Sequence, residues 1–364
     1  PPRSTLFPYT TLFRSFSASD DLFLTHDIDV IGGQAASGVL DKLAGQCRAH
    51  GLQLWIDLAI GLADGTGPFV AKREDWWHKS EAASLDPRTI HRQHERAARF
   101  ADEAVCRELT SFWQDRLLRW QAAGVSGVRC HGAADLPLEL WRDILLPAQQ
   151  AQPSFAAFGW MPGHPRRTLV EAGGVFQFLP SSVAWWTGGE PWLVQEYNDL
   201  SGSAALIGFP EDPFGKRITE PAAINLDRRH SLAVSAAALL ADGWLMPMGF
   251  EFEMEAPFIE ARREDFEEAS SHRTDELHDQ IRALNQALAT RSSAEHRSMR
   301  GLELRTDFAA IVRAENGRPA QLVLLNRDPI NACEPEIERL AAKVEARPKG
   351  RNIERQLPAA ESTL

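Results

Sequence analysis

The chain contains few cysteines and no excess of basic residues. Its four cysteines are scattered over 364 residues, and none stands in a Cys-x-x-Cys spacing. This pattern indicates reduced thiols in a cytoplasmic protein rather than a disulfide framework or a zinc site. A formal net charge of −11 argues against nucleic acid and anionic membranes as partners. No apolar run approaches the roughly 20 residues that a membrane-spanning helix needs.

Motifs for nucleotide cofactors, serine hydrolases and metals are also absent. No glycine-rich phosphate loop follows the first predicted strand, and no Gly-x-Ser-x-Gly turn occurs. His91 and His94, with Glu95, have a spacing suited to metal ligands on a helix, but no third ligand follows, which favours a solvated helix face. The acidic stretch Glu251–Glu268 lacks the alternating pattern of a calcium loop. We therefore expect no metal and no cofactor.

Tryptophan, in contrast, is abundant, with eleven residues against two tyrosines. Most of these indoles are expected in the core. Flat indole faces also suit sugar rings, because they offer an apolar surface with a polar edge. The pairs Trp76–Trp77 and Trp185–Trp186 stand in predicted loops, and we consider them as alternative sugar-binding platforms.

The first fifteen residues differ in character from the rest of the chain. Thr5–Ser15 reads TLFPYTTLFRS, which when back-translated resembles a common sequencing adapter. We therefore treat residues 1–15 as an artefact of metagenomic sequencing and leave them out of the fold prediction. The genuine chain is expected to begin near Phe16, inside a domain that is cut upstream.

Short apolar strands alternate with helices from residue 33 to residue 250. The predicted strands are 52–58, 125–131, 154–160, 174–180, 204–210 and 243–250, and the predicted helices are 33–50, 106–121, 138–150, 165–172, 191–200 and 228–241. Regular alternation indicates parallel strands covered by helices. Because no phosphate loop supports an open nucleotide-binding sheet, we predict an α/β fold, an incomplete (β/α)8 barrel.

The C-terminal part has a different pattern. After a helix predicted at 274–290, residues 302–304, 308–313 and 321–325 read as antiparallel strands, with Asn316-Gly317 as a hairpin turn. A charged amphipathic helix is predicted at 335–347. We expect four units: the artefactual 1–15, a barrel domain 16–295, the start of an all-β domain 296–330, and a helix with a tail 331–364.

Several strand ends resemble those of the alpha-amylase superfamily, and most closely the bacterial alpha-1,4-glucan:maltose-1-phosphate maltosyltransferases. The matching segments are Trp55-Ile56-Asp57-Leu58-Ala59, Asp75-Trp76-Trp77, Gly127-Val128-Arg129 and Gly249-Phe250-Glu251. The resemblance covers residues 20–328. It implies strands 3–8 of a TIM barrel, followed by part of an antiparallel β-sandwich domain.

The resemblance also implies positions for the catalytic groups. Retaining enzymes that act on α-glucans need a carboxylate nucleophile and a carboxylic acid/base. These positions correspond to His131 and Phe158, and no Asp or Glu occurs in residues 116–134 or 146–170. A third carboxylate corresponds to Asp212. Asp57, Arg129 and Glu211 would bind substrate together with the two tryptophan pairs, although Arg129 is equally suited to an ion pair with Asp57 or Asp212.

These observations predict a catalytically degenerate, maltosyltransferase-like domain. It would bind an α-glucan or a maltosyl phosphate, or act as a scaffold for a fused or associated active maltosyltransferase domain. One alternative is an active glycosyltransferase or glycosidase, with His131 as nucleophile or with the displaced carboxylates Glu211, Asp212 or Asp135. The other alternative is a structural domain without affinity for sugars.

Overall fold

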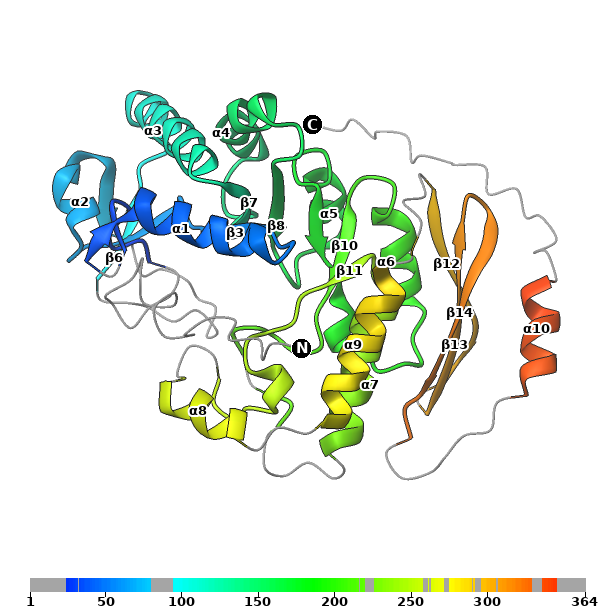
Figure 1. Ribbon diagram of the computed structural model, residues 1–364. Coiled ribbons are helices and arrows are strands. Elements are labelled where there is room, and N and C mark those ends of the chain that lie inside the picture. Colours follow the sequence, from blue (N-terminus) through cyan, green and yellow to red (C-terminus); the bar gives the residue numbers. More distant parts are fainter. Residues whose placement is uncertain are drawn as a thin grey trace, which may run out of the picture.

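A six-stranded parallel sheet forms the centre of the molecule in the computed structural model (Figure 1). Its strand order is β11-β10-β9-β8-β7-β3, and all neighbours are parallel. The strands are β3 (Leu54–Leu58), β7 (Val125–His131), β8 (Ala156–Trp160), β9 (Phe178–Pro180), β10 (Ala205–Gly208) and β11 (Gly243–Trp244). The predicted alternation is therefore confirmed.

The structure describes residues 24–31, 33–79, 94–215, 217–219, 226–257, 261, 263–271, 275–289, 291, 296–305, 307–328 and 336–345.

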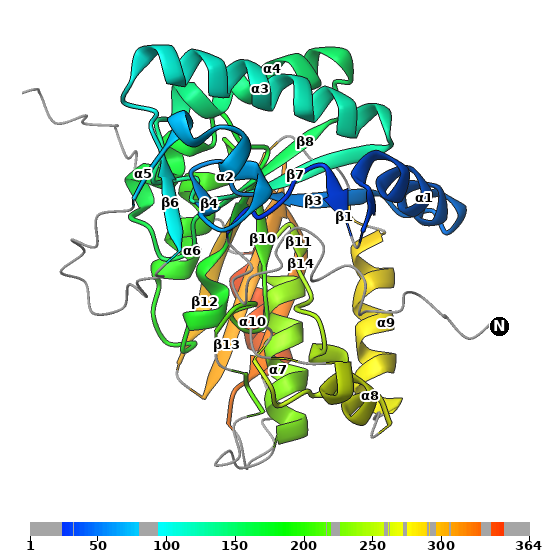
Figure 2. The same ribbon diagram turned by 90° about the vertical axis from the view of Figure 1, so that its left-hand side faces the viewer.

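Helices connect successive strands. They are α1 (Ala36–Ala49), α3 (Glu103–Ala122), α4 (Leu138–Ala151), α5 (Arg166–Ala172), α6 (Trp192–Leu200) and α7 (Leu226–Leu239). The side chain of Asp102 begins α3 by accepting hydrogen bonds from the backbone amides of Ala104 and Val105. Leu109, Trp113 and Leu117 recur along α3 at helical spacing and are buried. In Figure 2, α3 and α4 lie side by side across the sheet.

Two strands are much shorter than the sequence suggested. β11 pairs only at Gly243 and Trp244, and Pro247 lies three residues beyond, where it removes a backbone donor and so cannot extend the ladder. β9 pairs only from Phe178, because residues 174–176 instead form turn hydrogen bonds at the end of α5. Apolar content alone does not distinguish paired strand residues from buried turns.

A small antiparallel sheet follows β3 and was not predicted. It consists of β4 (Leu62–Asp64), β6 (Glu95–Ala98) and β5 (Trp77–Lys79), next to the short helix α2 (Pro68–Lys72) and the 3-10 turn η1 (Glu74–Trp76). Glu95 begins β6, so the helix expected around His94 is wrong; a helical spacing of two polar residues is not specific enough to identify a helix. His91 lies outside the described residues. Two further short strands, β1 (Val30–Ile31) and β2 (Gln34–Ala35), pair with each other.

The C-terminal sheet is antiparallel, as predicted. It comprises β12 (Arg297–Leu304), β13 (Phe308–Glu315) and β14 (Arg318–Asn326). Asn316 and Gly317 both have positive φ, which is the conformation of a tight hairpin turn. This sheet lies between α6 and α7 on one side and α10 (Ile337–Glu345) on the other, where Leu340 is buried against Phe308 and Ala310 (Figure 1). The helix α9 (Asp275–Ala289) packs beside α7, and α8 (Arg263–Ser271) precedes α9 in the chain.

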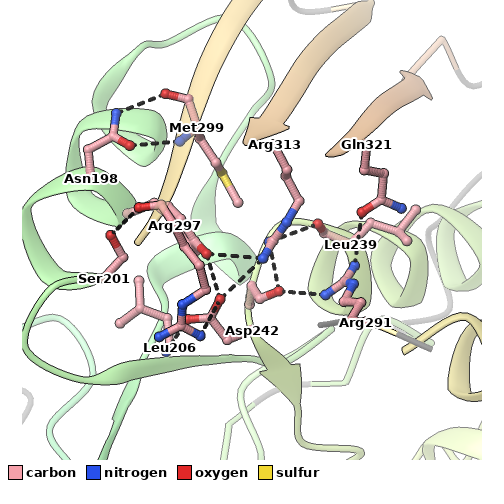
Figure 3. Close-up of polar contacts among 12 residues, drawn as sticks. Asn198, Ser201, Leu206, Leu239, Asp242, Arg291, Arg297, Met299, Arg313 and Gln321 are labelled. Atoms are coloured by element: carbon pink, nitrogen blue, oxygen red, sulfur yellow. Dashed lines mark hydrogen bonds and ion pairs between the residues drawn. The ribbon is translucent and has the colours of Figure 1, made fainter. Parts of the chain in front are cut away.

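A buried ion cluster joins this sheet to the parallel sheet (Figure 3). Asp242, which is only 5% exposed and lies just before β11, accepts hydrogen bonds from Arg313 of β13 at 3.1 Å and from Tyr197 of α6 at 2.5 Å. Arg297 of β12 pairs with the same carboxylate at 2.9 Å. The second oxygen of Asp242 accepts the backbone amide of Leu206 at 2.9 Å. Each oxygen of this carboxylate is therefore satisfied, as a buried charge requires.

Several arginines surround the single carboxylate of Asp242, and the pKa of one of them, Arg291, is lowered as a result. Burial, together with the charge of Arg313, lowers the pKa of Arg291 to about 10. Arg291 and Arg313 both donate to the backbone carbonyl of Ala241, at 2.9 and 2.8 Å. Asp242 thus compensates the buried guanidinium of Arg313 and the partly buried guanidinium of Arg297, and removing its charge would leave both without this counter-charge.

We expect Asp242→Asn to lower the free energy of unfolding by about 3 kcal/mol, because it leaves buried arginines without a counter-charge. Urea unfolding followed by circular dichroism measures the loss. Asp307→Asn is the matched control: Asp307 also pairs with an arginine, Arg305, but both side chains are about half exposed, so the cost should stay below about 1 kcal/mol. Equal stability of the two variants would contradict the assignment of Asp242 as the link between the sheets.

Candidate functional site

The candidate site lies at the carboxyl ends of β3 and β7, where the parallel register places Asp57 beside Arg129. The guanidinium of Arg129 donates to both oxygens of Asp57, from Nε at 2.5 Å and from a terminal nitrogen at 2.7 Å. The side chain of Asp57 is about half exposed, whereas that of Arg129 is mostly buried. The structure therefore selects the ion pair with Asp57 among the roles considered for Arg129. Asp57 keeps an exposed edge through which it can accept further hydrogen bonds.

His131 approaches the same carboxylate from the end of β7. Its Nε2 lies 3.2 Å from Asp57 Oδ1, and its side chain is buried. Desolvation would raise the pKa of Asp57, but the charges and hydrogen bonds of Arg129 and His131 outweigh it and hold that pKa well below its usual range. Asp57 is thus an ionised acceptor shared by two cationic or potentially cationic neighbours.

Aromatic side chains fill the inside of the sheet at the level of these residues. Phe158, for which the sequence predicts the acid/base position, packs edge-on against Trp160, and Trp160 packs against Phe209 of the segment after β10. The ring centroid of Phe214 lies 5.2 Å from Cζ of Arg129 and 5.6 Å from the ring centroid of His131. The ring of Trp160 lies 5.4 Å from the guanidinium of Arg129. We name these four rings, Phe158, Trp160, Phe209 and Phe214, the aromatic plug.

A glycine in β7 makes room for a further ring beside the plug. A Cβ at Gly127 would lie 2.6 Å from the indole of Trp55, closer than any side chain allows. Trp55 can therefore lie across β7 and contact Phe178 edge-on, with the ring centroids 5.6 Å apart. The interior is consequently occupied by packed rings at the height of the plug.

Glu211 does not face the candidate site, contrary to the sequence expectation. Its side chain forms a buried ion pair with Arg217 and accepts the backbone amide of Ile218 at 2.8 Å. Arg217 also donates to the backbone carbonyls of Met248 and Ala256. The pair therefore ties the loop after β10 to the loop after β11, and it has no free edge for a substrate.

The other candidate carboxylates lie in turns. Asp212 Oδ1 accepts the backbone amide of Phe214 at 3.0 Å, so Asp212 positions one ring of the aromatic plug. Asp135 is exposed in the loop after β7, where its amide donates to the carbonyl of Gly132. Neither residue pairs with Arg129 among the described residues. In that part of the chain, no three His, Cys, Asp or Glu side chains are close enough to hold a metal ion.

Three of the four candidate platform tryptophans are buried. Trp76 and Trp77 pack among Phe69 and Phe112 beneath the small sheet, and Trp186 is equally enclosed. The expectation that these three present faces to a sugar is therefore wrong, because their neighbours cover both sides. Trp185 is 47% exposed and retains the geometry of a platform.

The aromatic plug was not predicted from the sequence, although part of its signal is present there. Phe158 and Trp160 are two apart in a strand, so they point to the same face. Phe209 and Phe214 come from irregular segments that no periodicity describes.

None of the helices in the described part of the chain is long and apolar enough to cross a membrane.

Comparison with curated proteins finds a relative of known name. The chain is 30% identical over 224 residues to the alpha-1,4-glucan:maltose-1-phosphate maltosyltransferase of Burkholderia pseudomallei (strain K96243). The match covers 59% of this chain and 20% of that protein, so the chain spans about a fifth of the relative's length. No family model matches the chain.

Solved structures show the same fold. A cyclomaltodextrinase superposes with a TM-score of 0.67 at 16% identity, covering 88% of this chain and 59% of its own. An alpha-amylase from Geobacillus thermoleovorans superposes with a TM-score of 0.67 at 15% identity, covering 84% and 73%. These matches confirm the predicted incomplete TIM barrel. The chain thus shares the fold of these enzymes, and part of its sequence is similar to that of a maltosyltransferase.

Proposed function

We propose that this chain is a catalytically degenerate, maltosyltransferase-like domain that binds α-glucan at the mouth formed by Asp57 and Arg129. The observation that carries the proposal is the aromatic plug. A retaining mechanism needs two carboxyl groups about 5 Å apart on either side of the sugar. Here the acid/base position holds Phe158, which is buried against Trp160, and the nucleophile position holds His131, which is directed at Asp57.

The chemistry at the mouth favours binding over bond cleavage. A carboxylate with an exposed edge and a guanidinium are strong partners for vicinal sugar hydroxyls, since charged groups form the stronger hydrogen bonds. The residue at the expected acid/base position cannot protonate a glycosidic oxygen, because Phe158 has no acidic proton to give. A histidine nucleophile would also form a cationic adduct, without the negative charge that stabilises an oxocarbenium-like transition state.

A role as scaffold for an active domain would use the same barrel without requiring glucan affinity. This role is the second outcome of the binding test below. The relative is much longer than this chain, which leaves room for a scaffold role. The exposed edge of Asp57 favours glucan binding over that role.

We expect no maltosyl transfer above the uncatalysed rate when the chain is incubated with maltose 1-phosphate and a malto-oligosaccharide acceptor. Phosphate release and chain extension measure it. Turnover at enzyme-like rates that disappears in His131→Ala would overturn the proposal. Turnover that survives His131→Ala but is lost on Glu211→Gln, Asp212→Asn or Asp135→Asn would instead establish an enzyme with displaced carboxylates.

We expect Asp57→Ala to weaken binding of maltoheptaose at least about tenfold, because it removes an ionised acceptor of hydroxyl hydrogen bonds. Isothermal titration calorimetry measures the affinity. Asp143→Asn is the control, because Asp143 is exposed on α4, away from the strand ends. Folded wild-type protein that does not bind maltoheptaose would exclude glucan binding and leave the scaffold role.

Glucan affinity should be constant from pH 7 down to about pH 5, because Arg129 and His131 hold the pKa of Asp57 well below its usual value near 4. A depressed pKa keeps the carboxylate ionised until strongly acidic conditions. In Arg129→Gln the main opposing charge is lost while desolvation remains, so the pKa of Asp57 rises. The variant should then lose affinity as the pH falls through this range. Titration calorimetry at four pH values tests both profiles, and an identical pH dependence in the variant would contradict the coupling.

A further inference from the structure

One ring of the aromatic plug differs from the other three in its exposure. Phe158, Trp160 and Phe209 are all buried, so neighbouring side chains cover their faces. Phe214 packs against these three rings but is only partly buried. Among the four rings, Phe214 is therefore the one that a bound molecule can touch.

Phe214 lies at the mouth itself. The guanidinium of Arg129 lies against its ring and at the same time donates to both oxygens of Asp57. The side chain of Asp57 is 53% exposed. One guanidinium group therefore connects a partly exposed aromatic ring to an exposed carboxylate.

The turn that carries Phe214 is closed by its own residues. Oδ1 of Asp212 accepts the backbone amide of Phe214 at 3.0 Å, and the backbone carbonyl of Asp212 accepts the amide of Gly215 at 3.3 Å. A Cβ at Gly215 would lie 2.9 Å from Oδ2 and 3.0 Å from Cβ of Asp212. A side chain at this position would press against the turn, so the glycine permits its tight closure.

Buried contacts on both sides of this turn anchor it. Glu211 precedes the turn and pairs with Arg217, and Arg217 donates to the backbone carbonyl of Ala256 at 3.1 Å. Glu211 also accepts the backbone amide of Ile218 at 2.8 Å. A ring that is held in place before binding loses little conformational freedom when a ligand arrives, and this preorganisation favours affinity. Phe214 is therefore a fixed surface.

An aromatic ring and an ionised carboxylate recognise different parts of a sugar. The C–H face of a glucose unit is apolar and packs on an aromatic ring, whereas its hydroxyl groups donate to a carboxylate and accept from a guanidinium. The other three rings of the plug occupy the interior next to Phe214. A glucose unit can consequently reach Phe214 only from the solvent side, outside the plug.

We propose that Phe214 is the sugar platform of the mouth and that it selects internal units of an α-glucan. A glucose ring lies against the exposed part of Phe214, and its hydroxyl groups reach Asp57 and Arg129. Because this unit stays outside the plug, the glucan chain can continue from both of its sides. The inference rests on the proposed glucan binding at the mouth, and it adds the residue that recognises the apolar face and the part of the glucan that is bound.

Calorimetric titration of the full chain with maltoheptaose and with β-cyclodextrin tests which part of the glucan is bound. β-Cyclodextrin is a closed ring of the same number of α-1,4-linked glucose units and has no chain end. It should bind about as tightly as maltoheptaose, because internal units are present in both. Binding of maltoheptaose without binding of β-cyclodextrin would overturn the selection of internal units.

Phe214→Leu should weaken binding of both glucans about fivefold or more, because leucine keeps the apolar volume but has no flat face. Phe214→Tyr keeps the face and should restore nearly the wild-type affinity. Phe112→Leu is the matched control and should bind like the wild type. Phe112 is also a partly buried ring beside a guanidinium, with its centroid 5.4 Å from Cζ of Arg116, but it lies on α3 and packs against Phe69.

A fluorine label decides the question if circular dichroism shows that Phe214→Leu does not fold. The fluorine resonance of 4-fluorophenylalanine at position 214 should shift when maltoheptaose is added, with the dissociation constant that calorimetry gives. The same label at position 112 should not shift.

The contradicting outcomes separate the two proposals. An unshifted resonance at position 214, or wild-type affinity in Phe214→Leu, overturns the platform alone when Asp57→Ala still weakens binding. Wild-type protein that binds neither glucan overturns the proposed function and the platform with it.

Discussion

The bidentate pair between Arg129 and Asp57 determines what the mouth of this barrel can do. The two residues are direct partners in the parallel register of β3 and β7, so the backbone itself brings a guanidinium to a carboxylate. The pair holds Asp57 ionised and holds Arg129 under the rings of Trp160 and Phe214. His131, Trp160 and Phe214 each contact this oriented pair.

The aromatic plug follows from the same constraint. Parallel strands whose ends converge leave a space that carboxylates and water can fill or that side chains can pack. His131 and Phe158 bring no carboxylate to their two strand ends, and close packing of rings fills the space beside them. Gly127 and Trp55 extend the same packing one layer deeper. A single choice of residue types at two strand ends thus explains why the interior is closed.

Much of this fold could be predicted from the sequence, because hydrophobic periods of 2 and 3.6 residues are local signals. The prediction for β7 matches residue for residue, and the pairing of Asp57 with Arg129 was among the alternatives. The small sheet around β6 escaped prediction because its strands are short and half-polar. Glu211 was misassigned because its partner Arg217 lies in an irregular turn, where no spacing rule indicates a pair.

The state of Asp57 also bears on whether a displaced carboxylate could perform the chemistry. A nucleophilic carboxylate needs a free oxygen aligned with the anomeric carbon. Both oxygens of Asp57 accept hydrogen bonds from Arg129, and one lies next to His131. Such stabilisation lowers the pKa of the carboxyl group and, with it, the basicity that a nucleophile uses. Breaking the pair to free an oxygen would leave Arg129 without its counter-ion beneath two aromatic rings. The interaction that keeps Asp57 ionised therefore also makes it poorly suited to act as a nucleophile.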